Sequence, residues 1–397
     1  MSSNTEQTGK LDHGRSARID RALKKYVDAG KIAGVLGMVA HRGEIVYSQC
    51  YGMQNIEAKR PMADDTIFRI YSMSKPITSV AVLMLYEEGC FHLTDPISRF
   101  IPAFRDMYVL KRSTSEDMEL SKAQTEITIW HLLTHTAGLS YGFDAEDPLD
   151  KLYQDRLWAH IQQHPETTLA EVIGLLATLP LAHEPGTAWR YSMATDVLGY
   201  LVQVVSGRPF DVFLKERIFD PLGMTDTDFY APPEKHERLA AVYGPGEDGK
   251  LRVVGDPVTG RFTQPTKCPM GGGGLVSTAS DYMKFSQMLL NMGELEGCRL
   301  LGRKTVELMT QDHLGPELGL PDSPGHGFGL GVSVLTDLAR TRTLGSVGSY
   351  GWGGAANTNF WIDPHEQLIG LLMLQFMPSG TYPIVPDFRV AVYQALL

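Results

Sequence analysis

The segment from Ser74 to Glu88 constrains the fold most, because it has helical periodicity but is apolar on every side. Positions three and four residues apart form one apolar face, and Val82 and Leu83 make the opposite face apolar as well. A helix without a polar face is stable only when it is buried between layers of other elements. Pro76 suits the first turn of this helix and Gly89 suits its end. We therefore predict a layered α/β protein with this helix inside it.

Strand-like runs near both ends of the sequence predict a single sheet. Residues 33–40 and 44–52 are separated by His-Arg-Gly, in which Gly43 supplies the positive φ of a tight hairpin. Residues 368–376 form the longest apolar run, which is far shorter than the ~20 residues of a membrane-spanning helix and predicts a buried strand. We expect the strands of the two ends to pair into one antiparallel sheet flanked by helices. Further strands are predicted over 328–335 and 357–362.

The middle of the chain is mostly helical in its pattern, with long connections. Thr168 and Glu171 form a capping box ahead of an apolar run, and Gly207 ends the helical pattern that begins at Thr195. We therefore predict two lobes with the active site between them. The proposed division is a flexible N-terminal tail at 1–18, an α/β lobe at 19–93 and 261–397, and a mostly helical lobe at 94–260.

Charge and cysteine content exclude several kinds of partner. The chain has 36 Lys and Arg against 46 Asp and Glu, so its net charge is −10, which disfavours binding to nucleic acid or to an anionic membrane surface. The four cysteines lie far apart and show no zinc-ligand spacing, so neither a zinc site nor a disulfide framework is expected. The polar N-terminus is unlike a secretory signal. We expect a cytoplasmic protein without a membrane anchor or a metal.

Residues 72–75 read Ser-Met-Ser-Lys and form the chemical centre of the sequence. Ser72 and Lys75 lie one helical turn apart on the same face. Burial disfavours the ammonium form of a lysine, and a neutral amine within reach of the serine hydroxyl can take its proton. Ser-x-x-Lys alone is a weak motif, and a capping serine with a solvated lysine is the alternative. The apolar helix that follows gives Lys75 few routes to water, which favours a catalytic pair.

Two further segments carry groups that would complete such a site. Tyr191 follows a turn at 183–187, and a phenol acts as a base only beside a cation such as Lys75, because its ordinary pKa is about 10. A half-buried tyrosine bonded to a backbone carbonyl is the alternative. Residues 351–355 read Gly-Trp-Gly-Gly-Ala, and glycines beside a strand let a ligand approach the backbone. An N–H of an edge strand there could hold an oxyanion, whereas a tight turn with a packing tryptophan is the alternative.

Together these segments resemble the serine β-lactamase and penicillin-binding-protein superfamily. The run at 72–75, the Tyr-Ser-Met triplet at 191–193 and Trp-Gly-Gly at 352–354 occur in the order and at the separations of that superfamily. The resemblance covers about residues 35–376 and is greatest to the family VIII carboxylesterases, the ester-cleaving branch related to class C β-lactamases. Supporting matches lie at Thr66–Arg69, Leu132–Leu139, Pro221–Met224, Gly272–Leu275 and Ser280–Asp281.

The resemblance implies a two-step acyl transfer with a role for each matching residue. Ser72 would be the acylated nucleophile, Lys75 its partner base, and Tyr191 the phenol that deprotonates the serine and later the water. The backbone N–H groups of Ser72 and Ala355 would form the oxyanion hole, and Tyr141 would line the substrate pocket. The superfamily fold is an antiparallel sheet flanked by helices with a second, mostly helical lobe. Neither a metal nor an organic cofactor is implied.

Two departures from the lactamase pattern favour esters. Met193 replaces the asparagine that holds the acylamino group of a β-lactam, and Trp352, Gly353 and Gly354 replace the Lys-Thr-Gly that holds its carboxylate. A pocket lined by Tyr141 and these four residues should favour uncharged, fairly apolar acyl groups. We therefore predict a serine esterase for small esters with short- to medium-chain acyl groups and at most residual β-lactamase activity.

Three alternatives remain open at this stage. An acyl-enzyme can pass its acyl group to an alcohol, which makes the protein an acyltransferase. It can also turn over D-amino-acid amides or peptides. A binding module that kept the scaffold is the third alternative, which the presence of Ser72, Lys75 and Tyr191 disfavours. The natural ester, its chain length and self-association into homo-oligomers are left open.

Three other motifs are predicted to be structural. Residues 138–142 spell Gly-x-Ser-x-Gly, with His183 and Asp196 as candidate partners, but a nucleophile elbow needs a strand before the serine and a helix after it. The pattern here is a helix before Ser140 and an acidic loop after it. His131 and His135 have helical metal-ligand spacing, but no glutamate accompanies them as in His-Glu-x-x-His. The glycines at 271–274 lack the Gly-Lys-Ser/Thr of a phosphate loop and are expected to border the active site.

Overall fold

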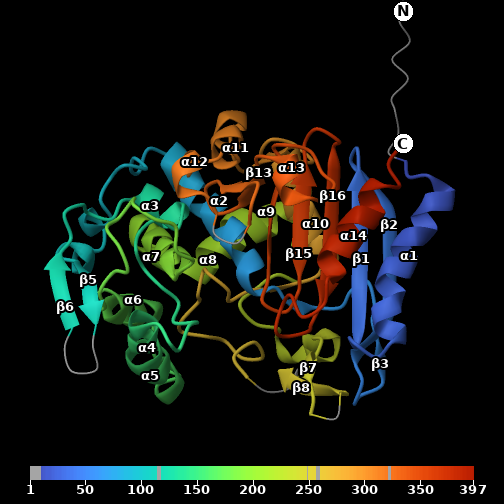
Figure 1. Ribbon diagram of the computed structural model, residues 1–397, viewed down its shortest axis with the longest axis horizontal. Coiled ribbons are helices and arrows are strands. Elements are labelled where there is room, and N and C mark those ends of the chain that lie inside the picture. The colour runs from blue at the N-terminus through green and yellow to red at the C-terminus, as the bar shows by residue number, and fades with distance from the viewer. Residues whose placement is uncertain (1–9, 114–117, 248, 256–259, 321–322) are drawn as a thin grey trace, which may run out of the picture.

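An eight-stranded antiparallel sheet organises the molecule (Figure 1). The computed structural model describes residues 10–113, 118–247, 249–255, 260–320 and 323–397. The first strand of the chain pairs with the last one, although more than 300 residues separate them, and the second strand pairs with the first, which confirms the predicted pairing of the two ends. In spatial order the strands are β12 (His326–Phe328), β13 (Ser333–Leu335), β14 (Tyr350–Gly353), β15 (Asn359–Asp363), β16 (Leu368–Leu374), β1 (Gly34–His41), β2 (Glu44–Asn55) and β3 (Arg60–Pro61).

The central strands are buried on both faces. β1 pairs with β16 from Val35 opposite Leu374 to His41 opposite Leu368. Along β16, Leu371 joins the core on one face of the sheet and Leu372 joins the core on the other. A strand covered on both faces reads as a continuous apolar run, so the structure confirms the buried strand predicted for 368–376.

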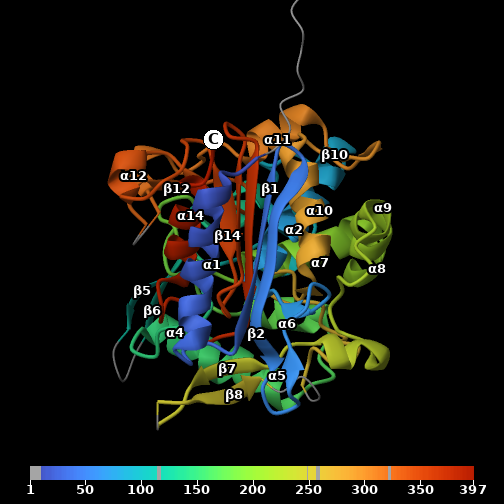
Figure 2. The same ribbon diagram turned by 90° about the vertical axis from the view of Figure 1, so that its right-hand side faces the viewer.

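Helices cover both faces of the sheet, as Figure 2 shows. α1 (His13–Asp28) and α14 (Ile384–Tyr393) lie on one side, and α2 (Ser74–Glu87) and α10 (Ala279–Leu290) lie on the other. Every residue of α2 from Ser74 to Leu85 is buried, as its all-apolar pattern predicts. α1 begins at His13, inside the segment 1–18 that was expected to be a flexible tail, because Asp12 caps it by accepting a hydrogen bond from the Arg15 amide at 2.8 Å.

Two predicted strands differ in detail from those observed. The run at 328–335 is not one strand, because Gly331 adopts a φ of +91° and turns the chain between β12 and β13. Residues 350–353 form β14, which lies inside the sheet and is not an edge strand. However, β13 pairs only with Tyr350 and Gly351 of β14. The end of β14 that carries Trp352 therefore has no strand beside it on that flank within the described residues.

The helical part of the molecule, residues 129–222, lies beyond α2 from the sheet (Figure 1). The predicted capping box is present, since Thr168 and Glu171 bond reciprocally at the start of α6, and Gly207 ends α7 with a φ of +68°. No single helix within the described ranges is long and apolar enough to cross a membrane. α7 and residues 210–222 reach that length and apolar composition only when taken together, and they are bent by 83° relative to each other. The helices of this part are α3 (Ile129–Leu133), α4 (Pro148–Leu152), α5 (Ala159–Gln163), α6 (Leu169–Leu176), α7 (Ala194–Ser206), α8 (Phe210–Leu214) and α9 (Asp220–Leu222).

Short hairpins and helices complete the fold. The hairpin of β7 and β8 falls within 94–260, the proposed helical lobe, but Tyr243 bonds to Gln375 just after β16. Its backbone therefore extends the α/β part of the molecule. The short elements are β4 (Phe68–Arg69) with β9 (Val276–Ser277), β5 (Tyr108–Ser113) with β6 (Met118–Lys122), β7 (Val242–Pro245) with β8 (Leu251–Gly255), β10 (Glu294–Leu295) with β11 (Cys298–Arg299), α11 (Arg303–Met309), α12 (Gly315–Leu318) and α13 (Leu338–Thr341).

Candidate active site

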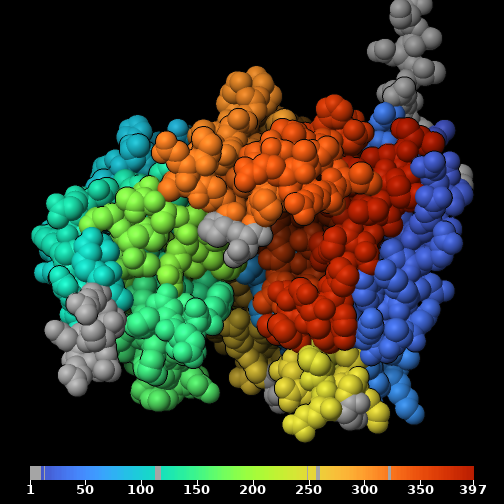
Figure 3. Space-filling model, viewed as in Figure 1, coloured from blue at the N-terminus to red at the C-terminus, as the bar shows by residue number. Residues whose placement is uncertain are grey.

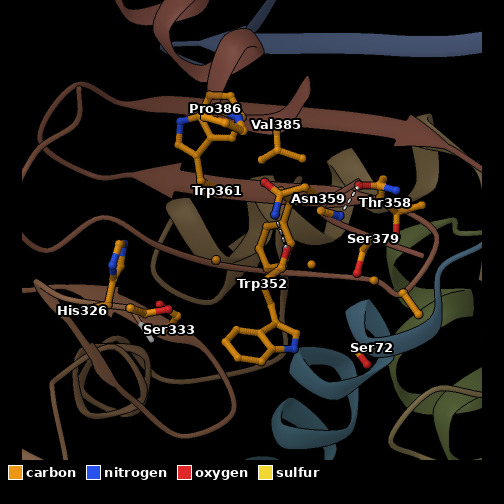
Figure 4. Close-up of a pocket in the computed structure, with 18 of the residues that line it drawn as sticks. Ser72, His326, Ser333, Trp352, Thr358, Asn359, Trp361, Ser379, Val385 and Pro386 are labelled. Atoms are coloured by element: carbon orange, nitrogen blue, oxygen red, sulfur yellow. Dashed lines mark hydrogen bonds between the residues drawn. The ribbon is translucent and has the colours of Figure 1, made fainter. Parts of the chain in front are cut away.

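A cavity of ≈ 820 Å³ opens between the helical part and the C-terminal strands. The space-filling view shows the surface hollowed beside the red C-terminal segment (Figure 3). Ser72 lies at one end of the cavity, and the strand β14 with the residues after it forms a long wall (Figure 4). The cavity therefore places the predicted nucleophile against the predicted oxyanion strand. Its wall includes Trp352, Gly353, Gly354 and Ala355.

Ser72 is held by a tight turn at the start of α2. It is the central residue of the 3₁₀ helix η1 (Tyr71–Met73), which runs directly into α2. Tyr71 has a φ of +43°, which costs a non-glycine residue about 1–3 kcal/mol and is found most often at functional sites. Gly354 packs on the same turn, since a Cβ there would lie 2.4 Å from the Ile70 carbonyl oxygen. Glycine at 354 thus lets the end of β14 approach the serine.

Lys75 lies beneath Ser72 and has no access to solvent. Its Nζ donates to Ser72 Oγ at 3.3 Å, to the Tyr141 hydroxyl at 2.9 Å and to the Gly272 carbonyl at 2.7 Å. Three acceptors match the three N–H bonds of an ammonium group. The same Nζ is 4.5 Å from the centre of the Tyr191 ring. A positive charge at this position stabilises negative charge on the Tyr191 oxygen and on the serine.

Tyr191 completes the contact with the serine. Its hydroxyl donates to Ser72 Oγ at 2.7 Å and accepts a hydrogen bond from Trp352 Nε1 at 3.4 Å. The ring of Tyr191 is packed by the His135 ring at 5.0 Å and the Trp189 ring at 6.0 Å. These neighbours fix the phenol in position. The structure therefore brings the Lys75 amine and the Tyr191 phenol, which are far apart in the sequence, within hydrogen-bond distance of the same serine oxygen.

A buried carboxylate lies behind the lysine. Asp196 in the first turn of α7 accepts the Gly272 amide at 2.8 Å, and burial raises the pKa of Asp196 although Lys75 opposes this. Burial also raises the pKa of the Tyr141 phenol, and the nearby carboxylate of Asp196 adds to the effect. A Cβ on Gly272 would lie 2.5 Å from the Tyr141 hydroxyl. The glycines at 271–274 thus border the site by close packing, as expected.

Tyr141 and Met193 were expected to line the substrate pocket, but both are buried and neither lines the cavity. Tyr141 is buried against Lys75. The ring of Phe143 stacks on the Tyr141 ring, with 4.8 Å between the ring centres, and it is Phe143 that lines the cavity. Met193 has no exposed surface and belongs to the core at the start of α7. The sequence analysis did not identify Phe143 as a wall residue because it stands at the start of an acidic loop. The one feature that could have indicated this role is that Phe143 is aromatic and lies two residues after Tyr141.

Ser140 is a structural residue. It donates to Asp150 and accepts from Arg190 Nε at 3.0 Å, and it is buried. Neither His183 nor Asp196 bonds to it, since His183 contacts the Glu184 carbonyl and Asp196 the Gly272 amide. The Gly-x-Ser-x-Gly run therefore forms no triad. Its serine instead helps to anchor Arg190, the residue before Tyr191.

The two histidines of the helical-spacing pair also have separate structural roles. α3 ends at Leu133, and His135 adopts a φ of +56°, so the pair does not share one helix face. His131 Nδ1 accepts the Thr128 amide as part of a capping box, and His135 Nδ1 contacts Ser192 Oγ at 3.2 Å. Among the described residues no three His, Cys, Asp or Glu side chains are grouped to hold a metal.

The Arg190 network gives a stability prediction. Arg190 pairs with Asp147 and Asp150 at 2.7 Å, and the Asp150 side chain is only 6% exposed. Burial alone would raise the pKa of Asp150, but hydrogen bonds from Ser140, the Asp144 amide and Arg190 lower it below its ordinary value of 3.8. Asp150→Asn should lower the free energy of unfolding at pH 7 by about 2 kcal/mol, because it removes one partner of a largely buried pair.

The pH dependence of this loss follows from the lowered pKa. The stabilisation by the carboxylate is complete above the ordinary pKa and is lost as pH falls through the lower, folded-state value. Urea unfolding at several pH values should therefore show the wild type and Asp150→Asn converging below pH 3.8. Asp155→Asn, which removes an exposed pair with Lys151, should change stability by less than about 0.5 kcal/mol. A constant difference down to pH 2 would contradict this account.

Comparison with known proteins shows similarity along nearly the whole chain. The sequence profile described as Beta-lactamase matches residues 19–394. Protein Rv1367c of Mycobacterium tuberculosis is 39% identical over 369 residues, which cover 90% of this chain and 89% of that protein. Esterase EstB of Burkholderia gladioli is 31% identical over 398 residues, which cover 95% of each chain. The solved structure of EstCE1, a hydrolase with promiscuous acyltransferase activity, superposes with a TM-score of 0.81 at 28% identity and covers 96% of this chain and 99% of its own.

Proposed function

This chain belongs to the beta-lactamase family, and we propose that it is a serine carboxylesterase of the family VIII branch that acts through an acyl-enzyme on Ser72. The observation that carries the proposal is the convergence of Lys75 Nζ and the Tyr191 hydroxyl on Ser72 Oγ, at 3.3 and 2.7 Å, at the end of a cavity. A nucleophile within hydrogen-bond reach of its base is the signature of covalent catalysis.

Acylation starts from the phenolate form of Tyr191, which has released its hydroxyl proton to solvent and takes the proton of Ser72 Oγ. The ammonium of Lys75 stabilises the negative charge as it passes between the two oxygens, because it contacts the serine and lies against the phenol ring. Ser72 Oγ attacks the ester carbonyl carbon and the C–O double bond opens to an oxyanion. Tyr191 then returns the proton to the departing alkoxide, and an alcohol leaves.

The oxyanion is held by backbone donors. The amide of Gly354 already donates to the Thr358 carbonyl at 2.7 Å, so the neighbouring amide of Ala355 is the donor that we assign, together with the amide of Ser72. Each such donor contributes about 3–4 kcal/mol to the transition state. Deacylation repeats the sequence with water, which Tyr191 deprotonates before it attacks the acyl-enzyme and releases the acid.

Ester hydrolysis is favoured over β-lactam hydrolysis by the side chains around the serine. The Trp352 indole stands against Tyr191 where the lactamase pattern has a lysine, and Met193 is buried in the core. Neither can bind the charged and amide groups of a β-lactam. Acyl transfer to an alcohol is the second candidate, which the promiscuous acyltransferase activity of EstCE1 supports. Both activities use the same acyl-enzyme.

Hydrolysis of p-nitrophenyl butyrate with product analysis tests the proposal. We expect butyrate and p-nitrophenol in equal amounts, one fluorophosphonate label per chain on Ser72, and a share of butyl ester when butanol competes with water. A labelled peptide that contains Ser140 instead of Ser72, or no turnover of any activated ester, would reject the assignment. D-alanine amide should be a much poorer substrate, because the described residues of the cavity wall include no acidic side chain that could anchor an ammonium group.

A further inference from the structure

The cavity wall away from Ser72 carries a partly buried cation. Arg389 on α14 lines this end together with Trp361 of β15, and its guanidinium carbon is 5.1 Å from the centre of the Trp361 ring. Figure 4 shows Trp361 and Pro386 well away from Ser72, with Asn359 between them. A single cavity thus joins the nucleophile to an arginine on a different element.

The guanidinium of Arg389 has no partner that compensates its charge. Its Nε is buried without a hydrogen bond, and no described carboxylate lies within ion-pair distance of it. The nearest acid, Asp363, is already bonded to the Tyr393 hydroxyl and to the amides of His365 and Glu366. Burial lowers the pKa of Arg389, which Tyr393 and Asp363 oppose, but an arginine stays charged at neutral pH. A buried donor without a hydrogen-bond partner, such as this Nε, is unfavourable unless a ligand satisfies it.

Two more unpartnered polar groups line the same end. His326 Nδ1 and Ser349 Oγ are both buried without a hydrogen bond, and both residues belong to the cavity wall. Burial lowers the pKa of His326, and the charge of Arg389 adds to this, so the imidazole is neutral and has one N–H to donate. A guanidinium, a hydroxyl and a neutral imidazole together supply several donors and one positive charge. A carboxylate, with two oxygens and one negative charge, complements this set.

We propose that this end of the cavity binds a free carboxylate of the substrate, so that the preferred substrates are esters that carry a second, ionised carboxyl group. The proposal rests on the proposed function, because it names the substrate class of the same site. This proposal replaces the expectation, drawn from the sequence, that the acyl group of the substrate is uncharged. β14 lacks the lysine of the lactamase pattern, but Arg389 on α14 contributes a positive charge to the cavity wall.

Two matched pairs of esters test which part of the substrate carries the charge. For the acyl side, mono-p-nitrophenyl adipate is compared with p-nitrophenyl hexanoate, which has a methyl group in place of the carboxylate. For the alcohol side, 4-carboxyphenyl butyrate is compared with 4-carbamoylphenyl butyrate. We expect kcat/KM to favour the carboxylate-bearing ester by about 10- to 100-fold in one pair, in keeping with a charge-assisted contact, and to fall as ionic strength rises.

Variants at Arg389 test whether the preference for the carboxylate-bearing ester depends on the charge of this side chain. Arg389→Gln should reduce the ratio within that pair to near one, and Arg389→Lys should keep part of it. Arg18→Gln is the matched control, because Arg18 donates to Gln394 near the end of α14 from outside the cavity, and it should leave the ratio unchanged. Equal rates within both pairs for the wild type, or a preference that survives Arg389→Gln in a folded protein, would overturn the proposal.

A binding measurement separates this proposal from the esterase proposal. Calorimetric titration of Ser72→Ala with monomethyl adipate should show binding that weakens about 10- to 100-fold when Arg389→Gln is added. If the wild type hydrolysed no ester but this binding were present, the esterase proposal would fail and the carboxylate site would stand. If esters were hydrolysed but binding did not depend on Arg389, only the carboxylate site would fail.

Discussion

Ser72→Ala is expected to reduce kcat/KM for p-nitrophenyl butyrate by roughly 10⁴- to 10⁶-fold, because it removes the oxygen that forms the acyl-enzyme and leaves only binding and the backbone donors. The side chain is small and stands at the cavity wall, so thermal unfolding should be almost unchanged. The assay combines initial rates with fluorophosphonate labelling of the same preparations.

Ser140→Ala is the informative comparison, since Ser140 is the other serine in a hydrolase-like motif. It should retain kcat/KM within about tenfold and should unfold at lower temperature, because its loss leaves Asp150 and Arg190 with unmet hydrogen bonds. A folded Ser72→Ala protein with substantial activity, or a folded but inactive Ser140→Ala protein, would show that the wrong serine has been assigned.

Tyr191→Phe and Lys75→Met are each expected to lower kcat by about 10²- to 10⁴-fold, the range for loss of a general base. Tyr191→Phe keeps the ring that packs on His135 and Trp189, so its effect is chemical and its stability should be close to that of the wild type. Lys75→Met keeps the length of the buried side chain but leaves the Gly272 carbonyl and the Tyr141 hydroxyl without their donor. It should therefore also be less stable.

The two variants separate the roles of the two groups. If Tyr191 takes the proton and Lys75 stabilises charge, Tyr191→Phe should abolish acylation in single-turnover experiments as strongly as Lys75→Met does. A Tyr191→Phe protein that retains more than about a tenth of wild-type kcat would make Lys75 the base. The geometry favours Tyr191, since its oxygen is 2.7 Å from Ser72 Oγ and the Lys75 ammonium already has three acceptors.

The proposed carboxylate site implies that one scaffold can change its preferred substrate by moving a charge. Trp352 on β14 places an indole beside Tyr191, whereas the nearest unpaired cation in the cavity is Arg389 on α14. A charge farther from the serine selects a longer substrate, because the carboxylate and the ester must be reached together. Comparing kcat/KM among mono-p-nitrophenyl esters of diacids with different chain lengths would measure, in solution, the distance between the serine and the carboxylate site.

The sequence alone predicted the layers of the fold and the candidate reacting groups. The all-apolar helix at 74–88 could be stable only inside the molecule, and the run at 368–376 only as a strand covered on both faces, because water penalises any other placement of so much apolar surface. Ser72, Lys75 and Tyr191 could be named because they stand in short motifs whose order and separation resemble a known superfamily. The local pattern around Ser140 also disfavoured catalysis at that serine.

Only the tertiary structure decided which groups share one cavity. Met193 belongs to the Tyr-Ser-Met triplet at 191–193 but is buried in the core, whereas Arg389, almost 200 residues from Tyr191, lines the same cavity as Ser72. Asp196 likewise comes to lie behind Lys75 through the Gly272 amide. The physical reason is that local patterns record whether a side chain is buried, while the contacts of a buried polar group depend on how distant elements pack together.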